Sequence, residues 1–164
     1  MILSNYKEFL DQMIEKIKHR GIDASELTID HLGYQASSEK DFDKKKAELH
    51  EFGEIKHDVQ VGERRVAIFK FFKPLKYQKQ LITAVEIVSP KKDQSVESAW
   101  EHIEIVPSVD LEEFMKKYPK ITWDTASLNR DIFPMITLKL DDKTKVKFPR
   151  RAVLEEVKRI KKNN

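Results

Sequence analysis

The same succession of predicted strands and helices occurs twice in this chain, once on each side of a short polar linker. In each copy the patterns are those of a strand, a helix and three further strands. Each copy opens on an acidic residue followed by a histidine, Asp30-His31 in the first and Glu101-His102 in the second. The linker Lys91–Ser95 carries no apolar side chain. A repeat of this kind predicts two βαβββ modules that share one core.

We expect one compact α+β domain built from four segments. They are an N-terminal helical segment at 1–26, a first βαβββ module at 27–90, a second at 96–148 and a C-terminal helix at 149–164. Apolar residues at spacings of three and four predict the first helix, and Gly21 is expected to end it. Ser38 and Asp110 are predicted to begin the helices of the two modules. Smaller predicted features are a turn or short helix at 23–26, a strand end at Pro74 and a short strand at 121–124.

The composition excludes several classes of function. Because the chain has no cysteine, thiolate metal sites and cysteine nucleophiles are ruled out. Four glycines leave no glycine-rich phosphate loop. With 31 Lys and Arg against 28 Asp and Glu, the net charge of +3 is too balanced to predict a nucleic-acid partner or a membrane partner. The start of the chain lacks the pattern of a secretory leader, so we expect a cytoplasmic protein.

Two histidines and one glutamate lie on three separate predicted strands. They are His31, Glu86 and His102. A divalent ion such as Zn, Fe, Mn, Ni or Co is bound by imidazole and carboxylate groups, and three such ligands leave positions open for water or substrate. An ionised glutamate in the apolar strand around Val85 and Ile87 needs a partner if it is buried. The pattern therefore predicts a metal site at His31, Glu86 and His102, with a basic residue as the other partner that Glu86 could have.

Three short stretches carry a resemblance to a known family. They are Ile29-Asp30-His31-Leu32-Gly33-Tyr34, Val85-Glu86-Ile87-Val88-Ser89-Pro90 and Ala99-Trp100-Glu101-His102-Ile103-Glu104. The layout resembles the vicinal oxygen chelate superfamily, which includes glyoxalase I, extradiol dioxygenases and bleomycin-resistance proteins. More narrowly, the stretches resemble YecM-like bacterial proteins. The resemblance covers roughly residues 27–148.

The resemblance implies a curled mixed sheet that forms a half-barrel around a metal. By its pattern His31, Glu86 and His102 match ligand positions, whereas the fourth position holds Lys147, a poor ligand while it is protonated. The metal would hold a small substrate through adjacent oxygens, for isomerase, lyase or dioxygenase chemistry. Related half-barrels also imply a monomer or a homodimer.

Two hypotheses of different class follow from these positions. The first is a metal-dependent enzyme in which Glu104, on the same strand face as His102, acts as the catalytic proton-transfer group. For Glu104 an exposed strand carboxylate is the more common alternative. The second is a non-catalytic protein that binds a small molecule without metal, with Lys147 paired to Glu86. His57, like the other remaining histidines, is expected at the surface, and Arg64 is expected in solvent or at the mouth of a cavity.

Overall fold

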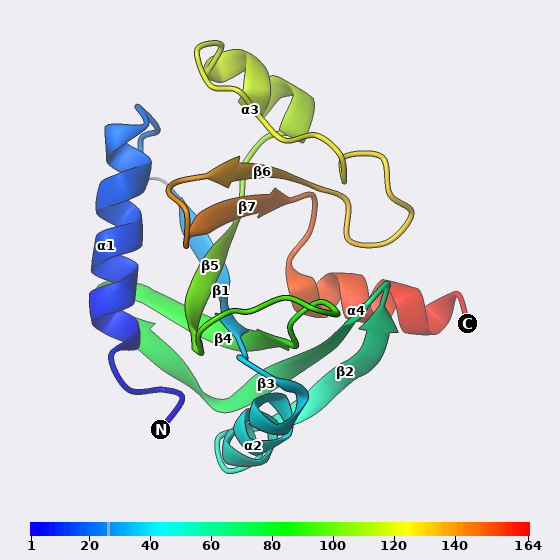
Figure 1. Cartoon of the computed structure of the whole chain (residues 1–164). Coiled ribbons are helices and arrows are strands. Elements are labelled where there is room, and N and C mark those ends of the chain that lie inside the picture. The colour runs from blue at the N-terminus through cyan, green and yellow to red at the C-terminus, as the bar shows by residue number, and fades with distance from the viewer. Residues whose placement is uncertain (26) are drawn as a thin grey trace.

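A computed structural model describes residues 1–25 and 27–164. Its described part contains four helices and a seven-stranded mixed sheet that curls without closing into a barrel, so the predicted α+β fold is confirmed (Figure 1). The helices are α1 (Tyr6–His19), α2 (Glu39–Leu49), α3 (Leu111–Lys117) and α4 (Val153–Lys162). The strands are β1 (Thr28–Gln35), β2 (Gly53–Val61), β3 (Arg64–Tyr77), β4 (Gln80–Val88), β5 (Ala99–Val106), β6 (Met135–Lys139) and β7 (Lys145–Pro149).

The sheet has the strand order β2-β3-β4-β1-β5-β7-β6. In each half the opening strand pairs in parallel with the closing strand, β1 with β4 and β5 with β7. The two halves meet where β1 and β5 pair antiparallel at the centre. The predicted strand at 121–124 is reduced to one isolated bridge between Asp124 and Thr137. Four adjacent strands, β4, β1, β5 and β7, therefore form the middle of the sheet.

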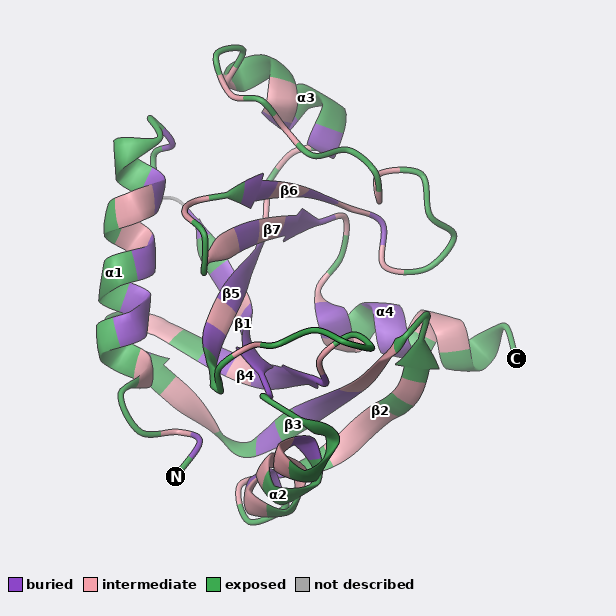
Figure 2. Ribbon diagram, viewed as in Figure 1, coloured by how far each residue is buried: buried purple, intermediate pink, exposed green. Residues whose placement is uncertain are grey.

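Buried apolar side chains cover one face of these strands, and buried polar residues lie on the other. Val85 and Ile87 of β4 pack in the main core with buried residues of α1 and α2. Ala84, on the opposite face of β4, packs instead with Val153 and Val157 of α4. In Figure 2 buried residues line the central strands, while α1 is buried only on the side that faces the sheet. The alternation predicted for β4 thus sends Glu86 to the face that α4 partly covers.

Several local signals act as the sequence predicts. Gly21 has φ +83°, and its N–H donates to the carbonyl of Lys18 at 2.8 Å, which closes the end of α1. The Ser38 hydroxyl accepts a hydrogen bond from Asp41 N at 3.1 Å and caps α2. Asp110 precedes α3 as predicted, although its side chain forms no cap hydrogen bond.

One local prediction turns out differently. Pro74 does not end the third strand, because β3 continues to Tyr77. Its register against β4 shifts between Lys70 and Leu75, so Pro74 lies where the ladder is interrupted and its missing N–H costs no pairing. The predicted turn at 23–26 includes Glu26, which lies outside the described residues. Across the part of the chain that the structure covers, no helix has the length and apolar content that a membrane crossing requires.

Candidate metal centre

The four central strands direct polar side chains to one point on the sheet. β4 supplies Glu86, β1 supplies His31, and β5 supplies both His102 and Glu104. Strand register brings them together, since His31 lies opposite Glu104 while Gly33 lies between Glu86 and His102. The three residues predicted from the sequence therefore converge, although they come from separate parts of the chain.

Each of these residues offers one donor atom, and the four donor atoms lie within 4.8 Å of one another. His102 Nε2 is 3.3 Å from Glu86 Oε1, and His31 Nε2 is 3.7 Å from Glu104 Oε1. Both histidines are completely buried, and Glu104 is only 3% exposed. The expectation of an exposed carboxylate at Glu104 is therefore wrong, because the curled sheet and the neighbouring strands cover this face.

A glycine makes room for one of the histidines. The ring of His102 lies directly over Gly33, where a Cβ atom would stand only 1.9 Å from Cε1 and 2.1 Å from Nε2 of that ring. Real contacts of a Cβ atom fall at about 3.4 Å or more. The sequence gives no reason to single out this glycine, because the strand pattern does not reveal which side chain crosses it.

The acidic residue before each histidine fixes the orientation of the imidazole. Asp30 Oδ2 accepts a hydrogen bond from His31 Nδ1 at 2.8 Å, and Glu101 Oε2 accepts one from His102 Nδ1 at 2.9 Å. In both rings Nε2 is therefore the atom aimed at the cluster. Metal-binding histidines in proteins commonly have this carboxylate support on the second nitrogen. The paired dipeptides of the sequence are the signal that could have predicted it.

Each supporting carboxylate is itself held by a second group. Asp30 Oδ2 also accepts the backbone N–H of Val153 at 2.9 Å, at the start of α4. Glu101 Oε1 also accepts a hydrogen bond from Lys145 Nζ at 3.0 Å. The pKa of Glu101 lies well below its ordinary value, because the favourable contacts with His102 and Lys145 outweigh burial, which would raise it.

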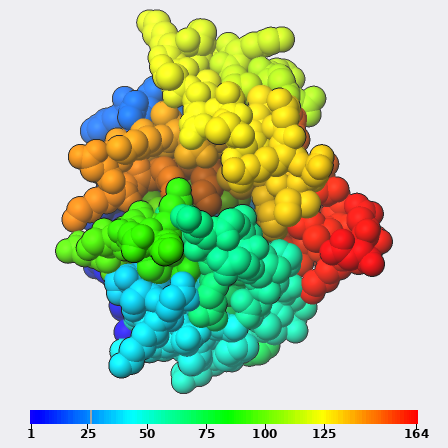
Figure 3. All heavy atoms as spheres, turned by 45° about the vertical axis from the view of Figure 1, so that its right-hand side comes forward, coloured from blue at the N-terminus to red at the C-terminus, as the bar shows by residue number. Residues whose placement is uncertain are grey.

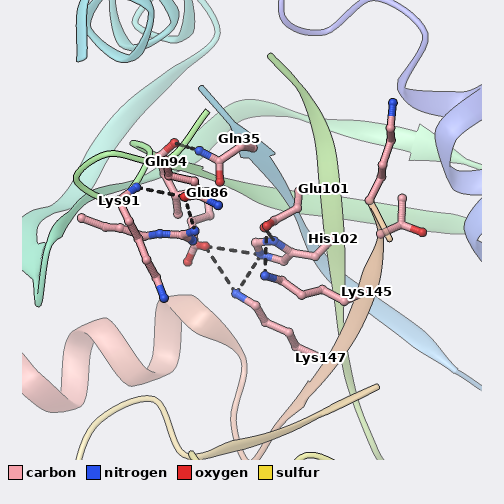
Figure 4. A network of polar contacts seen from close by, with 12 residues as sticks. Gln35, Glu86, Lys91, Gln94, Glu101, His102, Lys145 and Lys147 are labelled. Carbon is pink, nitrogen blue, oxygen red and sulfur yellow. Dashed lines mark hydrogen bonds and ion pairs between the residues drawn. The ribbon is translucent and has the colours of Figure 1, made fainter. Parts of the chain in front are cut away.

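Lys147 of β7 reaches into the same cluster. Its Nζ lies 3.0 Å from His102 Nε2, 3.3 Å from Glu104 Oε1 and 3.6 Å from Glu86 Oε1. Figure 4 shows the side chains of Glu86, His102 and Lys147 pointing toward one another, with Glu101 and Lys145 at one side. The predicted pairing of Lys147 with Glu86 is thus present, and Lys147 contacts other members of the cluster as well.

The close contacts between these groups shift their pKa values. Burial would raise the pKa of Glu86, but the charge of Lys147 and the contact with His102 lower it well below its usual range. Burial would lower the pKa of Lys147, but Glu86 and Glu104 raise it above its ordinary value. The cluster therefore favours an ionised glutamate beside an ammonium group.

The environment of His31 favours its charged form. Burial works against the charge, but the nearby Glu104 and the hydrogen bond to Asp30 outweigh it and raise the pKa of His31 to about 9. Within the described residues His31 Nε2 has no hydrogen-bond partner, although it is fully buried. In the neutral form of His31 this buried nitrogen, aimed at two carboxylates and a second imidazole, suits a metal ligand, and binding of an ion would release the proton. The donor set of two imidazoles and two carboxylates thus fits a divalent ion.

A cavity of about 690 Å³ opens beside the cluster, and Glu86 and Lys147 form part of its wall. In Figure 3 the surface is hollowed between the β2–β3 turn and the segment before β6. Basic residues dominate the charged lining, which contains Arg64, Lys91, Arg130, Lys145 and Lys147 against Glu63, Glu86 and Asp124. Two sequence interpretations are refined here. Arg64 lies at the cavity, whereas His57 is partly buried in its wall rather than free at the surface.

Comparisons with known proteins identify the family. The family model described as YecM protein matches residues 1–161. The chain belongs to the YecM family. It is 24% identical over 111 residues to Protein YecM of Escherichia coli and 34% identical over 89 residues to an uncharacterized protein of Haemophilus influenzae. These matches cover 68% and 54% of this chain, but only 59% and 47% of the relatives, so the chain spans about half of their length.

Solved structures confirm the fold. The structural-genomics protein EC4020 superposes with a TM-score of 0.79 at 22% identity, over 96% of this chain and 90% of that one. Methylmalonyl-CoA epimerase in complex with methylmalonyl-CoA and NH4+ superposes with a TM-score of 0.52 at 13% identity, over 77% and 96% of the two chains. The predicted relationship to YecM proteins and to the vicinal oxygen chelate fold is therefore confirmed.

Proposed function

We propose that this YecM-family chain is a metal-dependent enzyme that acts on a small anionic molecule with vicinal oxygens. The observation that carries the proposal is the convergence of two imidazole Nε2 atoms and two buried carboxylates. Each imidazole is held on its other nitrogen by a carboxylate. His31, Glu86 and His102 would hold the ion, with the Glu104 carboxylate beside it. The bound ion would polarise the oxygens of the substrate and stabilise negative charge on them.

The surrounding residues support a small anion as the substrate. The basic lining of the cavity favours a carboxylate or a similar group, and apolar side chains such as Ile68 and Phe133 would contact the rest of the molecule. Glu104 lies within 4 Å of both imidazoles and is the proposed proton-transfer group. Methylmalonyl-CoA, which is bound to one structural neighbour, carries a carboxylate of this kind. Isomerase, lyase and dioxygenase reactions all use such a framework, and the fold alone does not choose among them.

A second function is favoured by one contact. Because Lys147 Nζ lies 3.0 Å from His102 Nε2, a cation already occupies this part of the cluster. The protein would then bind a small molecule in the cavity without metal and without catalysis. In that case the cluster would be a closed network of charges.

Metal content separates the two functions. The protein would be purified without a nickel column, dialysed against Zn²⁺, Mn²⁺ or Fe²⁺, and analysed for bound metal. The first function predicts about one ion per chain. Glu86→Gln and His102→Ala should lose it, while His50→Ala, which removes an exposed histidine outside the cluster, should retain it.

Absence of metal from the wild-type protein, or equal loss in the His50→Ala control, would contradict the metal-dependent function. If metal is retained, turnover of vicinal diols, 2-keto acids and thiohemiacetals by the loaded protein would test catalysis. The Glu104→Gln variant should be inactive in the same assays, and unchanged turnover by that variant would refute its role.

A further inference from the structure

Lys147 occupies the space where a bound ion would meet its ligands. Its Nζ approaches three of the four donor residues, at 3.0 Å from His102, 3.3 Å from Glu104 and 3.6 Å from Glu86. Metal–ligand bonds to nitrogen and oxygen are about 2.0–2.2 Å long. An ion bound to the same atoms would therefore stand almost in contact with the ammonium group, and two cations at that separation repel each other strongly.

We propose that the Lys147 ammonium is the internal cation of this cluster and that a divalent ion binds only by displacing it. This inference rests on the proposed function, because it assumes that His31, Glu86 and His102 are metal ligands. It goes beyond that function by assigning Lys147 the role of a competitor that sets the affinity for metal.

Three features of the structure support the competition. β7 pairs in parallel with β5, and Lys147 lies opposite Glu104 in this pairing. Strand pairing therefore places the ammonium group next to the carboxylate. The side chain is only 16% exposed, and two buried glutamates compensate its charge. The cavity beside the cluster also gives the displaced side chain a place to go, since Lys147 already forms part of its wall.

The competition can be measured by titration with Co²⁺, whose affinity is followed by calorimetry and whose coordination is followed by visible absorption. Lys147→Met removes the ammonium but keeps an unbranched side chain. Lys91→Met is the matched control, because Lys91 lines the same cavity but takes no part in the ion pairs described for Glu86 and Glu104. We expect Lys147→Met to bind Co²⁺ at least about tenfold more tightly than the wild type, and Lys91→Met to bind within about threefold of it.

Thermal unfolding gives a second readout. Without metal, Lys147→Met should melt below the wild type and below Lys91→Met, because it leaves Glu86 and Glu104 buried without their cation. At the same excess of Co²⁺, the melting temperature of Lys147→Met should rise by more than that of the wild type, since the stabilisation by a ligand grows with the logarithm of its concentration divided by Kd.

Each outcome of the titration decides between the two claims. If Lys147→Met and the wild type bind Co²⁺ equally well, the competition is refuted and the metal-binding function stands. If Lys147→Met binds Co²⁺ and the wild type does not, the competition is supported and metal-dependent function of the wild-type chain is refuted. If neither protein binds Co²⁺, both claims fail.

Discussion

Replacing Gly33 with alanine should disrupt the cluster through a single steric contact. The added Cβ would lie 1.9 Å from Cε1 of His102, so the ring would have to retreat by about 1.5 Å to reach an ordinary contact. A shift of that size stretches the hydrogen bonds of His102 to Glu101 and Lys147, now 2.9 and 3.0 Å, beyond about 3.5 Å.

The cost of this shift can be estimated from its parts. Hydrogen bonds to charged groups contribute about 1.5–3 kcal/mol each, and overpacking of a core costs about 1–3 kcal/mol. Alanine in place of glycine in a strand recovers about 0.5–1 kcal/mol. We therefore expect Gly33→Ala to lower the free energy of unfolding by at least about 3 kcal/mol, a large share of the stability of an ordinary domain.

Urea denaturation of four proteins tests the steric origin of this cost. They are the wild type, Gly33→Ala, His102→Ala and the double variant. When His102 is already truncated, the alanine at position 33 meets no ring, so its cost should fall to about 0.5 kcal/mol or less. An equal cost of Gly33→Ala in both backgrounds would refute the reasoning, because the damage would then come from the strand and not from the histidine.

Two further predictions concern the support of His31. Asp30→Asn should destabilise the protein by about 1–3 kcal/mol in thermal or urea unfolding, because Asp30 bonds both His31 Nδ1 and the first turn of α4. It should also expose amides near Val153 to faster hydrogen exchange, and unchanged exchange there would contradict the link to α4. The pKa of His31 is raised to about 9 from 6.5, so its contribution to stability is complete below pH 6.5 and is lost as the pH rises through about 9. The metal-free wild type should therefore lose up to about 3 kcal/mol over this range relative to His31→Gln, and parallel stability curves for the two proteins would disprove the shift.

The grouping of His31, Glu86 and His102 could be predicted because the repeat in the sequence places them at related positions of two similar modules. Burial of Glu104 could not be predicted in the same way. The alternation of side chains along a strand shows which face of the sheet a residue lies on, but not whether other elements cover that face. The continuation of β3 through Pro74 was missed for a related reason, since a proline ends pairing only where its N–H would be needed.

Some parts of the site depend on the pairing of strands that are distant in sequence. The contact of Lys147 with His102 follows from the parallel register of β5 and β7, and nothing local fixes that register. The segment at 121–124 has the composition of a strand, but its partner offers a single bridge at Thr137. Local patterns thus predict the elements well, while long-range register decides which side chains meet.

The antiparallel seam between β1 and β5 means that neither half of the chain contains the complete cluster. A break in the exposed linker Lys91–Ser95 would leave one fragment with His31 and Glu86 and another with His102 and Glu104. Assembly of the cluster would then become a bimolecular event, governed by the concentrations of the two fragments. If the two fragments bind each other, the strength of strand pairing between β1 and β5 could be measured as a binding equilibrium. Metal binding at the assembled cluster would report how much of the complex has formed.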